Sequence, residues 1–107
     1  MKVVTTMLLL IATMGFGVRS LPAAPGEDTF KAKCAACHGQ DGSGNTPMGT
    51  RMKIRDLRSA EVQKQSDDEL ASIIANGKPP MPGFAKSLDK TAIHNLVLYI
   101  RSIAPKS

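Results

Sequence analysis

The chain has 107 residues, of which 42% are hydrophobic and 21% charged, and its formal net charge is +5. This length and composition fit one small globular domain and exclude a disordered, collagen-like or coiled-coil chain. Aromatic residues are scarce, with three Phe, one Tyr and no Trp, so a bound group is needed to help fill the core. A disulfide between the two cysteines, Cys34 and Cys37, would close too short a loop to stabilise the fold much.

The N-terminus has the pattern of a secretory signal peptide. One positive charge is followed by a largely apolar run at residues 3–18, which is shorter than a membrane-spanning helix, and then by small and turn-forming residues. We predict that the protein is periplasmic or otherwise exported across the cytoplasmic membrane, with cleavage after Ser20 or Ala23. Residues 1–23 would then be the signal peptide and residues 24–107 the functional domain. An uncleaved leader that serves as a membrane anchor is the alternative.

The first helix of the domain is predicted over residues 28–38, because acidic residues precede and open it. Phe30, Cys34 and Cys37 recur at helical spacing, so their side chains are expected to share one helix face. The next stretch, residues 39–53, contains four glycines and is predicted to be a long irregular connection.

Without the predicted signal peptide the chain would carry 12 basic and 9 acidic residues, a net charge of +3. The densest basic stretch begins at the end of the glycine-rich connection. The basic residues are Arg51, Lys53, Arg55 and Arg58. No aromatic residues are interleaved with them, as nucleic-acid binding usually requires, so we predict no nucleic-acid partner. The stretch is either a solvated loop or a docking patch for an acidic partner or for acidic groups of a cofactor.

Two further helical segments are predicted in the middle of the chain. A short turn of helix is expected at residues 59–64. A longer helix begins after Ser66, which forms an S-x-x-E capping box with Glu69, and it stops at Asn76 and Gly77. The side chains that this helix would bury are Leu70, Ile73 and Ile74.

The last helix is predicted from Asp89, as its N-cap, to about Ser102. It is the clearest amphipathic segment, and its apolar residues at helical spacing are Ile93, Leu96, Val97, Ile100 and Ile103. Before it, the proline-rich residues 78–86 are predicted to form a stiff, extended connection. No segment alternates with a period of two, so we predict an all-α fold of three to five short helices.

Residues 34–38, Cys-Ala-Ala-Cys-His, form the C-x-x-C-H pattern of c-type haem attachment. Side chains three apart on a helix lie on the same side, so Cys34 and Cys37 can form thioether bonds to haem vinyl groups while His38 binds the iron. We therefore predict one covalently attached haem c, which would also supply the missing bulk of the core. The apolar residues expected to pack against it are Phe30, Leu70, Ile74, Leu96 and Ile100.

Other uses of the two cysteines fit the sequence less well. A structural zinc site needs four ligands, but after Cys34, Cys37 and His38 the sequence offers His94 alone, without the paired histidine spacing of such sites. A thioredoxin-like motif needs a βαβ setting, which is missing. His94 itself is expected at the protein surface, with iron ligation as its alternative.

The second axial ligand is predicted to be a methionine, because a thioether can complete iron coordination opposite a histidine. Met48, Met52 and Met81 are the methionines outside the leader. Met81 lies among the prolines of residues 79–82, whose fixed backbone angles would hold its sulfur in place. We predict His38 and Met81 as the metal ligands, with Met48, Met52 or an open position as alternatives.

Three segments together, GEDTFKAKCAACHGQDGSG, KPPMPGF and AIHNLVLYIRSI, resemble the small bacterial class I monohaem cytochromes c over residues 26–103. The resemblance implies the all-α cytochrome c fold, with crossed first and last helices and the haem in a crevice between His and Met. Phe30 and Tyr99 match the aromatic residues of the family's first and last helices. It also implies that Pro47, nine residues after His38, accepts a hydrogen bond from the other imidazole nitrogen, although a simple turn is the alternative.

With both axial positions filled, the iron has no place for a substrate, so we predict an electron carrier and not an enzyme. The expected partners are redox proteins that donate and accept electrons in transient encounters, steered by charge onto an acidic surface, and the chain is expected to be a monomer. A peroxidase or sensor with an open iron position, a non-haem redox or metal-binding protein and a dedicated subunit of a larger complex are the competing interpretations. The sequence indicates no partner for the haem propionates, because a Trp found near them in some relatives is absent.

Overall fold

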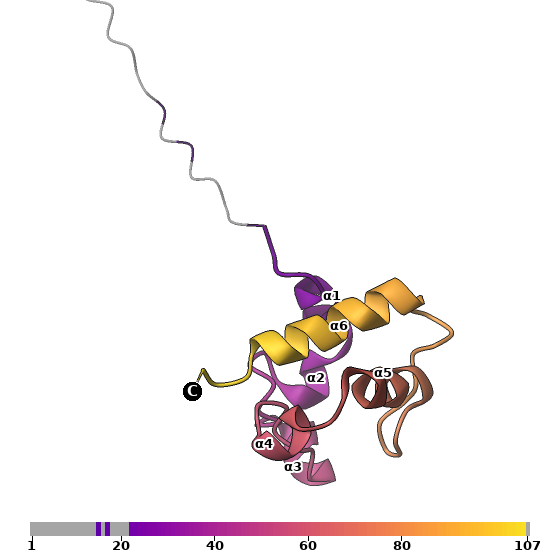
Figure 1. Cartoon of the computed structure of the whole chain (residues 1–107). Coiled ribbons are helices and arrows are strands. Elements are labelled where there is room, and N and C mark those ends of the chain that lie inside the picture. The colour runs from indigo at the N-terminus through magenta and orange to yellow at the C-terminus, as the bar shows by residue number, and fades with distance from the viewer. Residues whose placement is uncertain (1–14, 16, 18–21, 107) are drawn as a thin grey trace, which may run out of the picture.

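The computed structural model describes Gly15, Gly17 and residues 22–106, so Ser20 and nearly all of the predicted signal peptide lie outside the described residues. Within that described part the fold is all-α, as predicted, and has no β-strand (Figure 1). No helix there is long and apolar enough to cross a membrane. The described helices are six rather than three to five: α1 (Glu27–Lys33), α2 (Ala35–His38), α3 (Pro47–Met52), α4 (Ala60–Gln63), α5 (Asp67–Asn76) and α6 (Lys90–Ser102).

The first predicted helix is present but divided at Cys34 into α1 and α2. Cys34 has φ −117° and ψ −33°, away from regular helical angles. Hydrogen bonding continues across the division, since the Cys34 N–H donates to the Phe30 carbonyl at 2.8 Å and the His38 N–H donates to the Cys34 carbonyl at 2.9 Å. The C-x-x-C-H residues therefore occupy a separate short turn of helix that follows α1.

Helix α3 lies inside the stretch that we predicted to be irregular, and that prediction is wrong for residues 47–52. Thr46 is extended and its hydroxyl accepts a hydrogen bond from the Gly49 N–H at 2.8 Å, which makes Thr46 the N-cap. Pro47 follows at the first helical position, where its missing N–H costs no hydrogen bond. Thr46 and Pro47 together signal the start of a helix, but the surrounding glycines favour a loop.

The two long helices begin and end where predicted. The Ser66 hydroxyl accepts from the Glu69 N–H at 3.1 Å, and the Glu69 carboxylate accepts from the Ser66 N–H at 3.0 Å, which completes the capping box of α5. Asp89 caps α6 by accepting from the Ala92 N–H at 2.8 Å. Helix α4 is the predicted short turn.

Helix α6 is the centre of the core. Figure 1 shows it running across the domain, and it packs against both α1 and α5. The fully buried ring of Phe30 lies 5.0 Å from the ring of Tyr99 with a tilt of 49°, an arrangement favourable for aromatic pairs. Ile73 of α5 is partly exposed rather than buried as predicted. The buried apolar residues are Phe30, Ala35, Val62, Leu70, Ile74, Ile93, Leu96, Val97, Tyr99 and Ile100.

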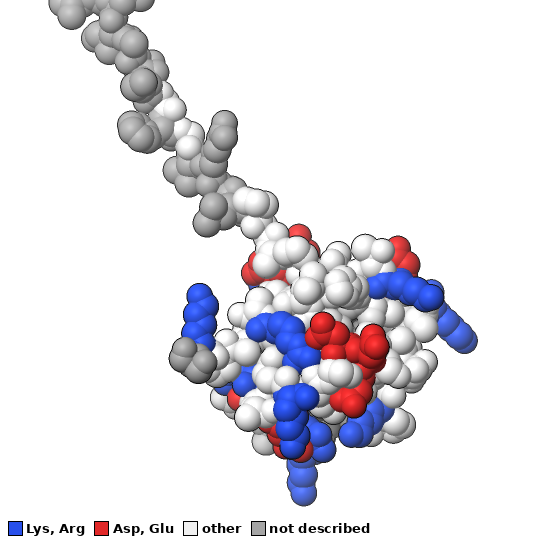
Figure 2. Space-filling view, viewed as in Figure 1, with Lys and Arg blue, Asp and Glu red and all other residues white. Residues whose placement is uncertain are grey.

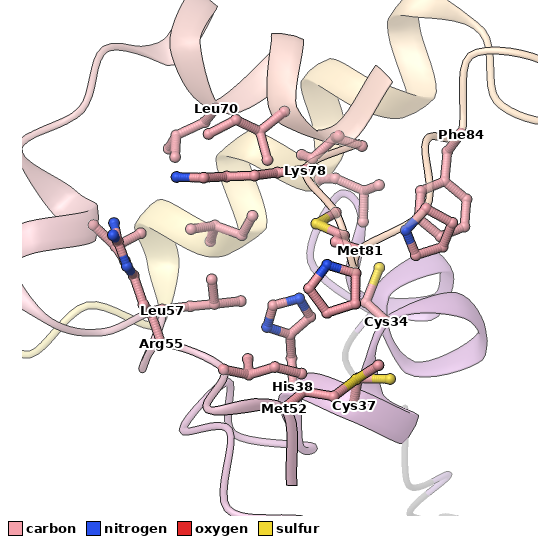
Figure 3. A pocket seen from close by; sticks show the side chains of 18 of the residues that line it. Cys34, Cys37, His38, Met52, Arg55, Leu57, Leu70, Lys78, Met81 and Phe84 are labelled. Atoms are coloured by element: carbon pink, nitrogen blue, oxygen red, sulfur yellow. The ribbon is translucent and has the colours of Figure 1, made fainter. Parts of the chain in front are cut away.

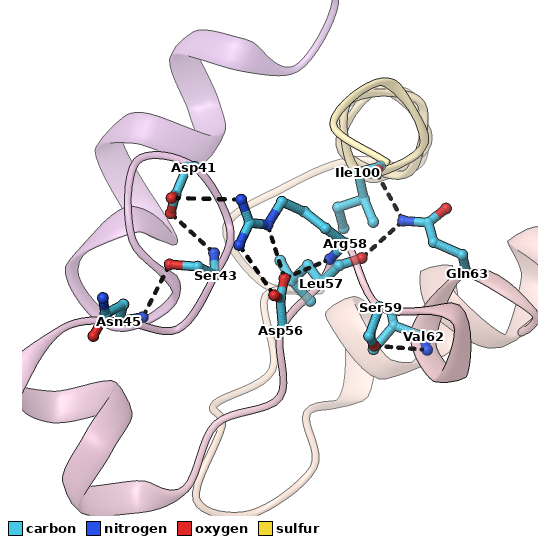
Figure 4. A network of polar contacts seen from close by, with 10 residues as sticks. All are labelled: Asp41, Ser43, Asn45, Asp56, Leu57, Arg58, Ser59, Val62, Gln63 and Ile100. Atoms are coloured by element: carbon cyan, nitrogen blue, oxygen red, sulfur yellow. Dashed lines mark hydrogen bonds and ion pairs between the residues drawn. The ribbon is translucent and has the colours of Figure 1, made fainter. Parts of the chain in front are cut away.

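Polar contacts order the connection between α3 and α4 (Figure 4). The Arg58 guanidinium donates to both carboxylate oxygens of Asp56, at 3.0 and 3.1 Å, and lies 3.7 Å from Asp41. The hydrogen bond from Arg58 lowers the pKa of Asp56 below its usual value. The Gln63 amide donates to the Ile100 carbonyl at 3.0 Å, which joins the end of α4 to α6.

Gly26 marks the closest approach of α1 to α6. Its φ is +82°, and a Cβ atom there would overlap the backbone carbonyl of Asn95. We predict that Gly26→Ala lowers the free energy of unfolding by about 3 kcal/mol, because alanine must adopt a left-handed conformation and also force the two helices apart. Urea unfolding of the purified protein measures the loss.

Gly42→Ala is the matched control for this prediction. Gly42 also has a positive φ, +77°, but a Cβ atom there would meet the terminal methyl group of Ile103, which can move. This variant should lose about 1 kcal/mol, the cost of the backbone conformation alone. Equal losses in the two variants would show that the contact with Asn95 does not limit residue 26.

Candidate functional site

A cavity of about 440 Å³ lies between the helices and the turn that precedes α6 (Figure 3). Its volume lies within the range of about 300 to 1,000 Å³ that is usual for small-molecule and cofactor sites. The lining is mostly apolar and comes from all six described helices, from residues 53–57 and 78–84, and from Gln65. The five residues predicted to pack against a bound group all line it: Phe30, Leu70, Ile74, Leu96 and Ile100.

Cys34, Cys37 and His38 are brought together at this cavity, as their spacing predicted. The two cysteines are not joined to each other by a disulfide. Burial raises the pKa of the Cys34 thiol to about 11, so this thiol is uncharged near neutral pH. Burial also lowers the pKa of His38, which favours the neutral imidazole, the form that binds metals.

The imidazole of His38 has one buried nitrogen, Nδ1, with no hydrogen-bond partner among the described residues. The predicted bond from this nitrogen to the Pro47 carbonyl is therefore not present in this structure. Pro47 is exposed at the start of α3 and does not line the cavity. Buried polar atoms without partners are rare in native proteins, so this nitrogen needs a hydrogen-bond partner that the described contacts do not supply.

All three candidate methionine ligands line the cavity, but they differ in exposure. Met81 is partly buried and packs against the hydrophobic core. Met48 and Met52, on α3, are 40% and 37% exposed. Figure 3 shows the Met81 side chain and the His38 ring projecting into the same space. The structure thus brings Met81 to the site and leaves the other two methionines at its solvent edge.

The segment that carries Met81 is a tight turn and not the extended connection that we predicted. The Met81 N–H donates to the Lys78 carbonyl at 2.7 Å, and the Lys78 N–H donates to the Met81 carbonyl at 3.1 Å. The intervening residues, Pro79 and Pro80, are joined by a cis peptide bond. Three residues later, the Phe84 N–H donates to the Ile74 carbonyl at 2.9 Å, which attaches the segment to α5.

The remaining sequence candidates are divided between the cavity and the rest of the surface. His94 is exposed on α6 and does not line the cavity, in agreement with the surface position expected for it. The basic stretch is not a single patch, because Arg58 pairs with Asp56 while Arg55 lies 3.3 Å from Glu61. Of the four basic residues, Lys53 and Arg55 line the cavity.

Thr46 is a site residue that the sequence analysis missed. Its hydroxyl donates to the Cys37 carbonyl at 2.7 Å while it accepts from the Gly49 N–H, so one side chain joins α3 to the C-x-x-C-H turn. Gly49 allows the close packing, since a Cβ atom there would overlap the Gly44 carbonyl and crowd that of Cys37. The polar cavity residues Lys33, Gln65 and Lys78 were also missed, and no periodicity signals them, because the contacts that define a cavity join distant parts of the chain.

Comparison with known proteins gives relatives of similar size. The chain is 30% identical to the cytochrome c6 of a Synechococcus species over 112 residues, which cover 100% of this chain and 97% of that protein. It is 29% identical to the cytochrome c6 of a Picosynechococcus species, over 94% of this chain and 89% of that one. A solved structure, the KustC0563 c-type cytochrome, superposes with a TM-score of 0.68 at 31% identity and covers 75% of this chain and 98% of its own.

The model of the family described as "Cytochrome C oxidase, cbb3-type, subunit III" matches residues 21–100. The chain belongs to this family and is a small monohaem class I cytochrome c. The cytochrome therefore carries haem c, bound covalently, and its likeness to the cytochromes c6 supports electron carriage as its function. Its cavity fits such a group on the protein's own chemistry, with two cysteine sulfurs, an imidazole and a thioether inside mostly apolar walls.

Thr46→Val tests whether this hydroxyl holds α3 against the C-x-x-C-H turn. Valine keeps the shape of threonine but removes both hydrogen bonds, so the free energy of unfolding of the cytochrome should fall by about 2 kcal/mol. Thr46→Ser is the control, because it keeps the hydroxyl and should lose much less. Urea unfolding followed by the helical circular dichroism signal measures both. A Val variant as stable as the Ser variant would contradict the role of the hydroxyl.

Proposed function

We propose that this cytochrome is a one-electron carrier whose haem is attached through Cys34 and Cys37 and whose iron is held by His38 and Met81. The observation that carries the proposal is that all four side chains line one apolar cavity. The haem supplies a reversible couple between Fe(III) and Fe(II). The polypeptide supplies the attachment, the two axial ligands and the exclusion of water.

Met81 is the ligand that the packing favours. It is less exposed than Met48 and Met52, and it stands on a turn fixed to α5 by backbone hydrogen bonds. A ligand held in this way can remain bound in both redox states. A thioether donor opposite a histidine also raises the reduction potential, which suits a carrier that accepts electrons from reduced partners of lower potential.

Filled axial positions and a dry cavity argue for electron transfer and against catalysis. With His38 and Met81 bound, the iron offers no position to oxygen, peroxide or a substrate. Phe30, Leu96 and Ile100 line the inner wall and are buried, so they keep water from the site. We infer that the protein is not an enzyme and that its oxidation state changes by outer-sphere transfer.

Pro47 has a smaller role in the proposal. We propose that its carbonyl accepts a hydrogen bond from His38 Nδ1 in the haem-bound protein. Two observations support this: Nδ1 is buried and lacks a partner, and Thr46 joins the first turn of α3 to the turn that contains His38. Such a bond would fix the orientation of the ring and strengthen the imidazole as a donor.

The proposed partners are redox proteins that dock briefly at the cavity edge. Lys33, Lys53 and Lys78 line the cavity and are exposed, so an acidic partner surface would be attracted to this side. Figure 2 shows basic side chains projecting around the domain and acidic ones gathered in the middle of the face in view, so the charge is unevenly distributed. We further propose that residues 1–23 direct export to the periplasm, that residues 24–107 form the mature domain and that it is a monomer.

The relatives differ in how much of their own length the chain matches. The two cytochromes c6 align with this chain over 89% and 97% of their own lengths. The Cbb3-type cytochrome c oxidase subunit FixP of Rhizobium etli is 28% identical, but the chain spans just 33% of that protein.

Met81→Ala tests the axial ligand. The variant should keep its red colour, because the haem stays attached, but it should lose the weak absorption band at the red end of the oxidised spectrum that a methionine–iron bond produces. Its reduction potential should also fall, because the thioether donor is lost. Visible spectroscopy and a potentiometric titration measure both effects.

Met48→Ala and Met52→Ala are matched controls, because both methionines line the same cavity. Each should keep the band and a potential close to that of the original protein. Persistence of the band in the Met81 variant, or its loss in one of the controls, would assign the ligand to another residue.

The attachment residues have their own test. Acidified organic solvent should extract no haem from the protein, because two thioether bonds retain it. The double variant Cys34→Ala, Cys37→Ala should yield either a colourless protein or one whose haem is fully extracted. A double variant that retains its pigment after extraction would show that the cysteines do not attach it.

A further inference from the structure

The cavity has two chemically different sides. Figure 3 shows the sulfur atoms of Cys34 and Cys37 on one side, and the Arg55 guanidinium and the Lys78 ammonium group on the other. All four residues line the cavity, and no Asp or Glu of the described residues does. A ligand that matches this cavity is therefore apolar, binds thiols at one edge and carries negative charge at the opposite edge.

Haem has this polarity. Its two vinyl groups lie at one edge of the ring, and its two propionate carboxylates lie at the other. When the vinyl groups react with Cys34 and Cys37, the carboxylates are directed to the side of Arg55 and Lys78. Carboxylates form strong, charge-assisted hydrogen bonds with both kinds of side chain.

Lys78 and Arg55 differ in their availability. Arg55 already lies 3.3 Å from the Glu61 carboxylate, so part of its charge is compensated within the protein. Lys78 forms no ion pair with any described residue. Its side chain extends from the turn across the cavity in Figure 3. Of these two cations, Lys78 is therefore the one whose charge is not compensated by a described residue.

The backbone of Lys78 is joined to that of Met81 by two hydrogen bonds, at 2.7 and 3.1 Å, which close the turn. Any group that fixes the Lys78 side chain therefore also restricts the turn that presents the Met81 sulfur. We propose that Lys78 binds a haem propionate and thereby holds the Met81 turn against the iron. The contact between the haem and Lys78 would then stabilise the bond between the iron and Met81. This inference rests on the proposed His38 and Met81 ligation.

Imidazole is the probe for this proposal. Added imidazole displaces a weakly held methionine from ferric haem, and its apparent affinity increases when the methionine turn opens more easily. Lys78→Gln should bind imidazole about fivefold more tightly than the original protein, the effect of one partly exposed ion pair. Loss of the methionine–iron band on titration, followed by absorption, gives the affinity.

Two further variants separate the proposed contact from a general effect of charge. Lys86→Gln removes the same charge from the same connecting segment, but Lys86 does not line the cavity, so its imidazole affinity should be unchanged. Lys78→Arg keeps a cation that can bind a carboxylate and should restore the original affinity.

The outcomes distinguish this inference from the proposed function. Equal imidazole affinities in the Lys78→Gln and Lys86→Gln proteins, with the band present in both before titration, would overturn the role of Lys78 and leave the His38 and Met81 ligation intact. Absence of the band from the original protein would overturn that ligation, and the inference with it. Failure of Lys78→Arg to restore the affinity would also overturn the propionate contact.

Discussion

The fold depends on a cavity that its own side chains do not fill. The described domain contains three aromatic residues, Phe30, Phe84 and Tyr99, of which Phe30 and Phe84 line the cavity and Tyr99 packs against Phe30. The mostly apolar walls of this cavity of about 440 Å³ lack the packing contacts that the side chains of a core normally make. Covalent haem therefore belongs to the core of this protein as much as to its chemistry.

The two sides of the cavity are built by different means and depend on one helix. The C-x-x-C-H side follows α1 directly, and Thr46 fastens α3 to it through the Cys37 carbonyl. The methionine side is a turn held on α5, where the Phe84 and Ala85 N–H groups donate to carbonyls near the end of that helix. Helix α6 packs against both α1 and α5, so it sets the separation of the two sides. The close contact of Gly26 with the Asn95 carbonyl fixes the start of α1 against α6.

The sequence predicted the parts of this structure that local interactions determine. The capping box of Ser66, the N-cap Asp89 and the C-x-x-C-H motif each act within a few residues, and the helices and the cavity side chains that they indicate are present. Helix α3 was missed because its start signal, Thr46, stands among glycines that favour a loop. The shape of the 78–81 turn was also missed, because prolines fix φ but not the pairing of the residues around them.

Lys78 and Arg55 share a position in the cavity that the sequence could not predict. A lysine before two prolines and an arginine in a basic stretch both suggest exposed residues, and both are exposed. Both residues line one edge of a cavity whose described lining contains no carboxylate. This shared position arises when the connections that follow α3 and α5 come together in the fold. Such a property depends on the tertiary fold, so neither periodicity nor spacing along the chain could have predicted it.

An electron carrier must keep its iron ligands dry while its redox group stays close to the surface. The described structure meets these opposing needs on different sides of the same cavity. Phe30 and Leu96 form a fully packed inner wall, whereas Met48 and Met52, 40% and 37% exposed, form the outer edge. Methionine suits that position because its flexible, polarisable side chain excludes water without a fixed shape and can adapt to more than one partner surface. In the proposed carrier these two methionines would therefore not be ligands but the thin apolar boundary across which electrons pass.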